Sequence, residues 1–386
     1  MTRSNTLSIA IIGAGPAGLT LARLLHVNGV KTTIFEREAN SEARLQGGSL
    51  DLHPDAGQRA LKESNLWDQF LRHSRPEGEA LVIVDASGER QIDFKGTGEQ
   101  RPEIDRKVLR QMLLDSLPAE YFRWGSNVRR VEGNGTIHFE DGVQTGFDLI
   151  VGADGAWSKV RPLVSPVKPF YSGIAGVEWT FENVEEDYPE ISKMVGDGSY
   201  FIYGPNKRIA AQRNGEGRIK MYACFRAPES WVADARIDLK DTEEVRELLL
   251  QTFSEIQSIH LDLIRLAKEY VARPLYMLPV EEQWDSQPGV TLVGDAAHLM
   301  TPFAGRGVNL AMCDSLDLAH AILQTMDDIP KAIKSYEKLM LERSTKEKAV
   351  TVARMNMQFA DDAPRPFVES VRARIDEYMK RSANGK

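Results

Sequence analysis

The first forty residues contain a continuous apolar run, then apolar residues at helical spacing, and then a second apolar run. "LSIAII" at residues 7–12 is a short apolar run, typical of a strand buried on both faces. After a glycine-rich turn, the apolar residues of 16–28 recur at the spacing of a helix, and Asn28-Gly29 supplies a C-terminal stop. "KTTIFER" at 31–37 favours a second strand. Together these segments predict a βαβ unit.

The same patterns predict further elements before the middle of the chain. Helical spacing returns over 55–63 and over 105–117, where Asp105 is a candidate N-cap. "VRRVEGNGTIHFEDG" at 128–142 is typical of a hairpin, because its "GNG" can supply the positive backbone angles of the turn. "FDLIVGADG" at 147–155 predicts another strand that leaves the core.

From about residue 165 to 277 the pattern changes to alternating aromatic and polar residues. This alternation favours an antiparallel sheet with one exposed face. The strand "VTLVGDAA" at 290–297 then returns to the first pattern. Helices are predicted at 242–253, 261–269, 307–325, 329–357 and 366–381.

This order of elements predicts an α/β protein in which one domain is interrupted by another. The expected division is 1–165 for the first part of a nucleotide-binding domain, 166–280 for a β-sheet substrate domain, and 281–360 for the second part of the first domain. Residues 361–386 are expected to form a C-terminal helix that bridges the two domains.

Composition narrows the possible partners. The net charge of −8 and the lack of a long basic block argue against nucleic acid and against an anionic membrane surface. The uncharged segment 4–22 is interrupted by glycines and its apolar arm is too short to span a bilayer, so we expect a cytoplasmic protein. Cys224 and Cys313 are expected to be packed free thiols, with neither disulfide nor metal. We expect a small-molecule partner and a monomer or weak dimer.

The first glycine-rich turn has the spacing of a dinucleotide site. Gly13, Gly15 and Gly18 form G-x-G-x-x-G between a predicted strand and helix, and Glu36 ends the next strand. The first glycine permits the turn, the second lets backbone approach a diphosphate, and the third allows close packing of helix on strand. Glu36 can accept hydrogen bonds from ribose hydroxyls and disfavours a 2′-phosphate, so the site suits FAD or NAD.

Two later segments add to this turn. Asp154-Gly155 ends a predicted strand, which taken alone is equally consistent with a simple turn. In "GDAAHLMTPFAGRGVNLAM", Asp295 leaves a strand where it could bind ribityl hydroxyls. Gly305 and Gly307 would let backbone lie flat against a ring, and the helix start near Gly307 would stabilise an anionic reduced flavin.

These three segments together resemble the fingerprint of the FAD-dependent aromatic hydroxylase family, the single-component (group A) flavin monooxygenases. "FERE", "EARLQGGSLDLHPDAGQRAL", "PEIDRKVLR" and "FRAPESW" are similar to the Tet(X)-type tetracycline-inactivating members. The resemblance implies a Rossmann-like FAD-binding domain of the GR2 type. The chain differs from the Tet(X) type at Lys220 and Tyr222, while Gln212 or Asn214 could supply the amide that those enzymes present to the drug.

The resemblance also assigns residues. It implies FAD contacts from Arg44, Asp51, Arg106 and Asp295, and it places Pro302 and Gly305 over the flavin. The full set of expected cofactor-binding residues is Gly13, Gly15, Ala17, Gly18, Glu36, Arg37, Arg44, Asp51, Arg106, Asp154, Gly294, Asp295, Pro302, Gly305, Gly307, Val308 and Asn309. The expected substrate-binding residues are Gln212, Asn214, Lys220, Tyr222, Pro302, Phe303 and Gly305.

The activity that the resemblance implies is a monooxygenation. NADPH or NADH reduces FAD, molecular oxygen forms a C4a-hydroperoxyflavin, and one oxygen atom passes to a phenolic or enolic cyclic molecule, of which tetracycline-type antibiotics are one case. No catalytic side chain is required, and His298 is expected to be structural. Arg37, Arg44, His53 and Arg106 are candidates for the approach of the reductant or are simply solvated. A flavoprotein oxidase or dehydrogenase, or a flavin-binding regulatory protein, is the alternative.

Overall fold

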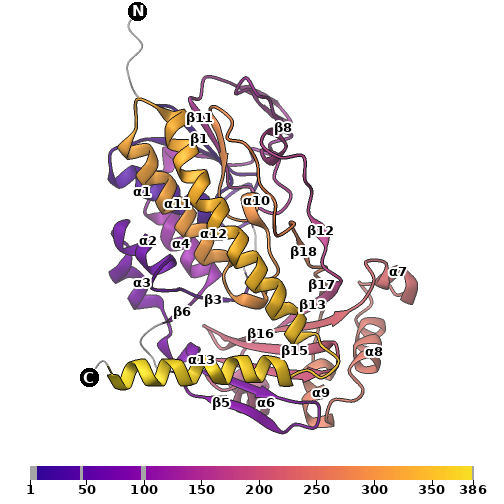
Figure 1. Ribbon diagram of the computed structural model, residues 1–386. Coiled ribbons are helices and arrows are strands. Elements are labelled where there is room, and N and C mark those ends of the chain that lie inside the picture. The colour runs from indigo at the N-terminus through magenta and orange to yellow at the C-terminus, as the bar shows by residue number, and fades with distance from the viewer. Residues whose placement is uncertain (1–6, 44–46, 97–100, 385–386) are drawn as a thin grey trace, which may run out of the picture. The chain divides into compact units, whose positions relative to one another are not determined.

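The computed structural model describes residues 7–43, 47–96 and 101–384. The contacts divide the chain into two compact units, each built from three segments of sequence (Figure 1). Unit 1 comprises Met1–Ser74, Ile104–Phe170 and Tyr276–Val350, and unit 2 comprises Arg75–Glu103, Tyr171–Leu275 and Thr351–Lys386.

Unit 1 is built on a parallel sheet of five strands in the order β19-β11-β1-β2-β7. These strands are β19 (Val290–Leu292), β11 (Leu149–Gly152), β1 (Ile9–Ile12), β2 (Thr32–Phe35) and β7 (Phe122–Arg123). The four residues of β1 are all buried, because neighbours pair with the strand on both edges and side chains pack on both faces. The predicted βαβ unit is present: β1 leads through α1 (Pro16–Val27) to β2.

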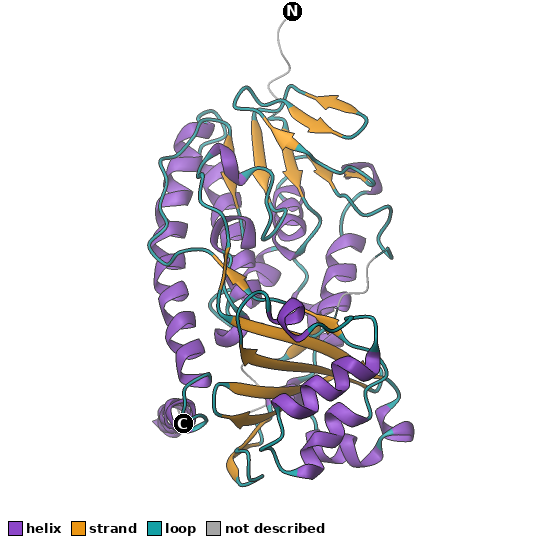
Figure 2. Cartoon of the chain, turned by 90° about the vertical axis from the view of Figure 1, so that its right-hand side faces the viewer, coloured by secondary structure: helices purple, strands orange, loops and turns teal. Residues whose placement is uncertain are grey.

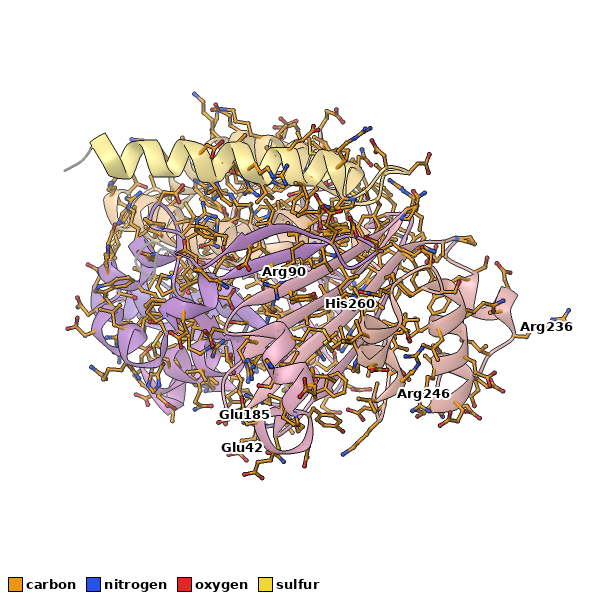
Figure 3. All side chains as sticks on the ribbon, turned by 90° about the horizontal axis from the view of Figure 1, so that it is seen from below. Glu42, Arg90, Glu185, Arg236, Arg246 and His260 are labelled. Atoms are coloured by element: carbon orange, nitrogen blue, oxygen red, sulfur yellow. The ribbon has the colours of Figure 1, made fainter. Side chains whose placement is uncertain are left out.

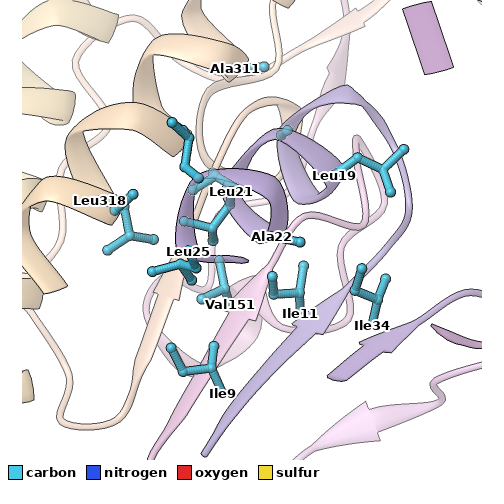
Figure 4. Close-up of a cluster of buried hydrophobic side chains, with 14 of the residues drawn as sticks. Ile9, Ile11, Leu19, Leu21, Ala22, Leu25, Ile34, Val151, Ala311 and Leu318 are labelled. Atoms are coloured by element: carbon cyan, nitrogen blue, oxygen red, sulfur yellow. The ribbon is translucent and has the colours of Figure 1, made fainter. Parts of the chain in front are cut away.

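One face of this sheet is covered by α1 and by α11 (Gly307–Gln324), which pack against each other. Figure 4 shows the shared core, in which Leu21 and Leu25 of α1 lie near Leu318 of α11 and near Val151 of the sheet. The first apolar run and the helical spacing that follows it in the sequence therefore form one continuous core.

The remaining elements of unit 1 surround this core. They include β3 (Ser49–Asp51), α2 (Gly57–Glu63), α3 (Trp67–His73), α4 (Arg106–Asp115), β8 (Arg130–Val131), β9 (Ile137–Phe139), β10 (Gly142–Gln144), β18 (Tyr276–Met277) and α10 (Asp295–His298). Three elements have residues in both units: β6 (Glu103–Asp105), β12 (Phe170–Tyr171) and α12 (Ile329–Gln358). The predicted hairpin is found as β8 and β9, and Gly135 in its turn has a φ of +82°.

Unit 2 is built on a seven-stranded sheet in the order β17-β13-β16-β15-β14-β4-β5. Its strands are β17 (Val271–Ala272), β13 (Ile174–Phe181), β16 (Arg218–Arg226), β15 (Lys207–Asn214), β14 (Ser199–Gly204), β4 (Leu81–Val84) and β5 (Arg90–Phe94). Pairing is antiparallel as predicted except between β14 and β4, which run parallel. Because β4 and β5 complete this sheet, residues 75–103 belong to unit 2, whereas the sequence analysis placed them in the first domain.

The two faces of this sheet differ in chemistry. Trp179, Met221 and Ile209 belong to the apolar face, whose core includes residues of α5 (Val184–Asp187), α6 (Pro189–Val195), α7 (Trp231–Ala235), α8 (Thr242–Thr252) and α9 (Ser258–Arg265). Figure 2 shows these helices in purple against the strands of unit 2. Nε2 of His260, on α9, lies 3.0 Å from the Tyr200 hydroxyl. His260 is labelled in Figure 3.

Part of the opposite face is covered by the C-terminal helix α13 (Arg365–Asn384). Phe367, Val368 and Val371 of this helix pack on Ile83 of β4 and Ile92 of β5. The side chains of β13, β15 and β16 on the same face are mainly polar, as the alternating pattern predicted.

Both cysteines are buried, and burial raises the pKa of the Cys313 thiol to about 12 and that of Cys224 above its usual value. Thiolates are the reactive form, so neither thiol should react at pH 8 with a disulfide reagent while the protein is folded. The amount of cysteine that reacts with the reagent should rise over the same range of urea concentration in which the circular dichroism signal is lost. Rapid labelling of the native protein would contradict this expectation.

Candidate functional site

The three glycines of the first turn have three different environments. A Cβ on Gly13, whose φ is +109°, would lie 2.4 Å from the carbonyl oxygen of Ala153, and a Cβ on Gly18 would lie 2.2 Å from the carbonyl oxygen of Gly13. At Gly15, by contrast, no described atom from elsewhere in the chain lies within 4 Å of the position that a Cβ would take. Gly15 is also the N-cap residue of α1, with no side chain among the described residues capping that end. The turn is thus closed against the protein at its ends and open at its centre.

Glu36 and Arg110 hold this turn from two sides. The Glu36 carboxylate is 8% exposed, and it accepts hydrogen bonds from the amides of Ala14 (2.7 Å) and Glu38 (3.0 Å). Arg110 on α4 donates through Nε to the Ala14 carbonyl (3.1 Å) and forms an ion pair with Glu38 (2.9 Å). Each carboxylate oxygen can accept more than one hydrogen bond, so Glu36 retains capacity for ribose hydroxyls.

The second segment contacts the first through Ala153 and contains a carboxylate with a spare oxygen. Asp154 accepts the Lys159 amide through Oδ2 (2.6 Å), whereas its buried Oδ1 has no partner among the described residues. Burial raises the pKa of Asp154 above its usual value. Nearby, the buried Arg161 donates to the carbonyls of Ala296 (2.7 Å) and Asp295 (3.0 Å), which joins this segment to α10.

The third segment begins at Gly294, where small residues allow close packing. Gly294 has a φ of +62°, and a Cβ there would lie 3.0 Å from the Cβ of Ala311 and 3.3 Å from that of Ala17. The Ser315 hydroxyl of α11 bonds the Ala17 carbonyl at 2.8 Å. A side chain at Gly294 would therefore force Ala311 or Ala17 to shift, and its left-handed φ also favours glycine.

A buried network around Asp314 fixes the same loop. Its carboxylate accepts the Gly294 amide (3.0 Å), lies 2.5 Å from Nε2 of His298, and pairs with Arg343 (2.9 Å). Burial alone would raise the pKa of Asp314, but His298, Arg343 and the Gly294 amide together hold it below its usual value. His298 is buried and bonded to Asp314, and its structural role stays a prediction.

The end of the third segment offers open backbone beside a second carboxylate. Gly305 is left-handed with a φ of +66°, and a Cβ there would lie 3.5 Å from Oδ1 of Asp51. At Gly307, the first residue of α11, no described atom from elsewhere in the chain lies within 4 Å of the position that a Cβ would take. The buried Asn309 donates to the Asp51 carbonyl (2.8 Å) and accepts the amide of His53 (2.7 Å). Its side chain thus fixes the 51–53 segment against α11.

The other residues predicted to bind cofactor or substrate differ in their exposure to solvent. Arg37, Arg106, Asp295 and Pro302 are exposed, whereas Val308 is half-buried. Phe303, predicted to bind substrate, is buried with 6% exposure. Arg44 lies outside the described residues.

The substrate candidates of unit 2 share one face of its sheet. Gln212 pairs with Lys220, and Asn214 and Tyr222 lie two positions further along their strands, so alternation places all four on the same side. Lys220 lies 3.4 Å from the carboxylate of Glu178 on β13. This face therefore combines amide, phenol and paired charged groups.

Sequence reasoning missed the residues that hold the turns in place. Arg110 stands four residues after the predicted Arg106 on the same helix, and that spacing is the signal that could have identified it. Nothing in the sequence marks Asp314 or Arg343, because their partners come from distant segments.

Two further searches of the described residues gave negative results. Residues 7–43, 47–96 and 101–384 include no group of three or more histidine, cysteine, aspartate or glutamate side chains arranged to hold a metal ion. Within these same residues no helix has the length and apolar character needed to cross a membrane.

Comparison with known proteins places this site in context. The family model described as "FAD binding domain" matches residues 6–351. Monooxygenase asqM of Emericella nidulans is 34% identical, with 94% of this chain and 98% of the relative covered. Among solved structures, HpxO of Klebsiella pneumoniae in complex with FAD and uric acid has a TM-score of 0.77 at 22% identity, covering 98% of this chain and 95% of that one. Tetracycline destructase Tet(51) has a TM-score of 0.67 at 22% identity, covering 93% of each chain. At these identities, the two structures show a shared fold.

Proposed function

The chain belongs to the FAD-binding domain family and is an FAD-dependent monooxygenase, and from this premise we propose that it uses NADPH or NADH to hydroxylate a phenolic or enolic cyclic small molecule. The family and the α/β fold are those that the motifs predicted. The reductant, the substrate and the roles of single residues are our proposal.

The observation that carries the proposal is the pattern of open and closed glycines in unit 1. Gly13, Gly18 and Gly294 are packed against other parts of the protein, whereas Gly15 and Gly307 face open space at the starts of α1 and α11. Other open glycines of unit 1, such as Gly29 and Gly125, lie in turns, whereas these two stand where a helix begins. Free amides there suit anionic groups of a bound cofactor.

The residues fit FAD in distinct roles. The start of α1 at Gly15 would bind the diphosphate, and Glu36 would accept hydrogen bonds from the ribose. The unpartnered Oδ1 of Asp154 would accept a hydrogen bond from the cofactor or the reductant. The backbone at Gly305 and Gly307 would lie against the ring system. FAD supplies the redox chemistry when bound, accepting reducing equivalents and activating oxygen. The protein contributes binding, orientation and exclusion of water.

The polar face of the unit 2 sheet supports the proposed substrate class. Gln212, Asn214 and Tyr222 can donate and accept hydrogen bonds, as carbonyl and enol groups of a planar substrate require. The Lys220–Glu178 pair suits a substrate that is polar without a full negative charge. Tetracycline destructase Tet(51) and HpxO bound to uric acid share the fold of this chain, so a tetracycline and uric acid are chosen as first probes.

The test is a substrate screen with isotopic oxygen. Purified protein is incubated with NADPH or NADH under ¹⁸O₂ and with a tetracycline, uric acid or a simple phenol, beside samples without reductant. We expect one member of the panel to accelerate reductant oxidation and to gain one ¹⁸O atom only when reductant is present. Product mass and reductant absorbance are measured together.

The alternative predicts a different result in the same samples. A flavoprotein oxidase would consume a substrate and release hydrogen peroxide in equal amount, with no ¹⁸O in the product. That outcome would overturn the proposed hydroxylation and the assignment of NADPH or NADH as reductant.

A further inference from the structure

A chain of four charged or polar side chains links the candidate flavin loop to α12 in unit 1. Asp51 Oδ2 lies 2.9 Å from Nε2 of His53, and Nδ1 of the same ring contacts a guanidinium nitrogen of Arg306. Arg306 in turn forms two hydrogen bonds with Glu347, at 2.9 and 2.7 Å. His53 is 2% exposed, so its ring is almost fully enclosed by these contacts.

The donors in this chain determine the tautomer of His53. A guanidinium carries only N–H donors, so Nδ1 of His53 must be the unprotonated acceptor. The proton of the neutral ring then lies on Nε2, which donates to Asp51. Both ring nitrogens are occupied in this arrangement, so His53 is not available as a general base.

The tautomer in turn orients the Asp51 carboxylate. Its Oδ2 accepts from His53, whereas its Oδ1 lies 3.5 Å from the position that a Cβ on Gly305 would take. Asn309 fixes the backbone on both sides of this segment. Arg306 is the N-cap residue of α11 and adjoins Gly305, so the loop and the carboxylate are held by the same network.

Arg306 is always charged and can only donate hydrogen bonds. The hydrogen bonds that Arg306 donates to the Glu347 carboxylate raise the pKa of Arg306, and the carboxylates of Asp55 and Asp51 add to this effect. Its ion pair with Glu347 is partly buried, with 25% and 18% side-chain exposure. The guanidinium therefore donates to Glu347 through Nε and Nη2 and to His53 through Nη1.

We propose that Arg306 is a positioning residue that acts through His53, fixing its Nε2–H tautomer so that Oδ1 of Asp51 is presented to a hydrogen-bond donor of the bound flavin. This inference rests on the proposed function of the Gly305 loop. It predicts that the effect of Arg306 on FAD affinity depends on Asp51, because His53 connects the two residues.

A double-mutant cycle tests the coupling. FAD dissociation is measured by flavin fluorescence on dilution of the holoenzyme for wild type, Arg306→Met, Asp51→Asn, the double variant and Arg306→Lys. Methionine has no N–H donor, so we expect Arg306→Met to weaken FAD binding about 10-fold, within the range for residues in one hydrogen-bond network, and less than about 2-fold further when Asp51 is already asparagine. Arg306→Lys keeps a donor for Nδ1 and should retain most of the affinity.

An equal loss from Arg306→Met in both backgrounds would overturn the proposal, since Arg306 would then act independently of Asp51. A second measurement does not depend on FAD binding. The nitrogen chemical shifts of ¹⁵N-histidine-labelled protein should show His53 protonated at Nε2 in the wild type and should lose this fixed state in Arg306→Met. A proton on Nδ1 would contradict the network, whereas failure of every variant and of wild type to bind FAD would contradict only the proposed function.

Discussion

Replacing Gly13 by alanine should destabilise unit 1 and abolish retention of FAD. The new methyl group would lie 2.4 Å from the Ala153 carbonyl oxygen, at a backbone φ of +109° that side chains rarely adopt. Backbone strain and overpacking together should cost about 4 kcal/mol. The flavin absorbance of the purified protein and the unfolding midpoint in urea measure the two effects.

Gly15→Ala is the matched control for this variant. A Cβ at Gly15 meets no described atom within 4 Å, and its φ of −83° suits any residue, so stability without cofactor should change by less than about 0.5 kcal/mol. FAD affinity should still fall by about 10-fold or more, because the methyl group enters the space that the proposed diphosphate would occupy. Normal FAD content in both variants would rule out this turn as the cofactor site.

Asp314→Asn should cause the second large loss of stability. The substitution removes the charge that Arg343 and His298 share, and breaking a buried ion pair at one partner costs about 3 to 5 kcal/mol. Asp317→Asn, which removes the outer carboxylate paired with Arg343, is the control and should cost about 1 kcal/mol or less. Equal urea midpoints for the two variants would contradict a special role of Asp314.

The same network gives this prediction a pH dependence. Because the pKa of Asp314 is lower in the folded protein than its usual value, its stabilising effect is fully present above about pH 4 and is lost as the pH falls through the folded pKa. The difference in stability between wild type and Asp314→Asn should therefore narrow in acid. Unfolding midpoints measured from pH 7 down to pH 3 check this direction.

Local features of the fold could be predicted from the sequence. The helix predicted at 307–325 is found at Gly307–Gln324, and that predicted at 329–357 is found at Ile329–Gln358, because apolar spacing and flanking glycine and turn residues mark their ends. The G-x-G-x-x-G turn was equally visible, because its chemistry depends on residues that are adjacent in sequence.

Features that depend on distant pairing could not be predicted. The apolar run at Leu81–Val84 is compatible with any sheet, and only its parallel pairing with β14 assigns residues 75–103 to unit 2. Likewise, His53 and Arg306 are separated by more than two hundred residues, so no local pattern reveals that they touch. The sequence identifies residues suited to a site, whereas tertiary packing decides which of them support it.

The order of pairing in unit 1 has a consequence for how a newly made chain matures. β11 ends at Gly152, but its neighbour β19 begins at Val290, so the whole central segment of unit 2 is synthesised before this edge of the sheet can be completed. The residues that follow β19 include Gly294, Asp314 and α11, which cover α1. At about 5 to 20 residues per second, the nascent chain would spend several seconds with α1 and its sheet partly exposed. We therefore expect cofactor capture to be a late event of biosynthesis and chaperone protection to matter most in that interval.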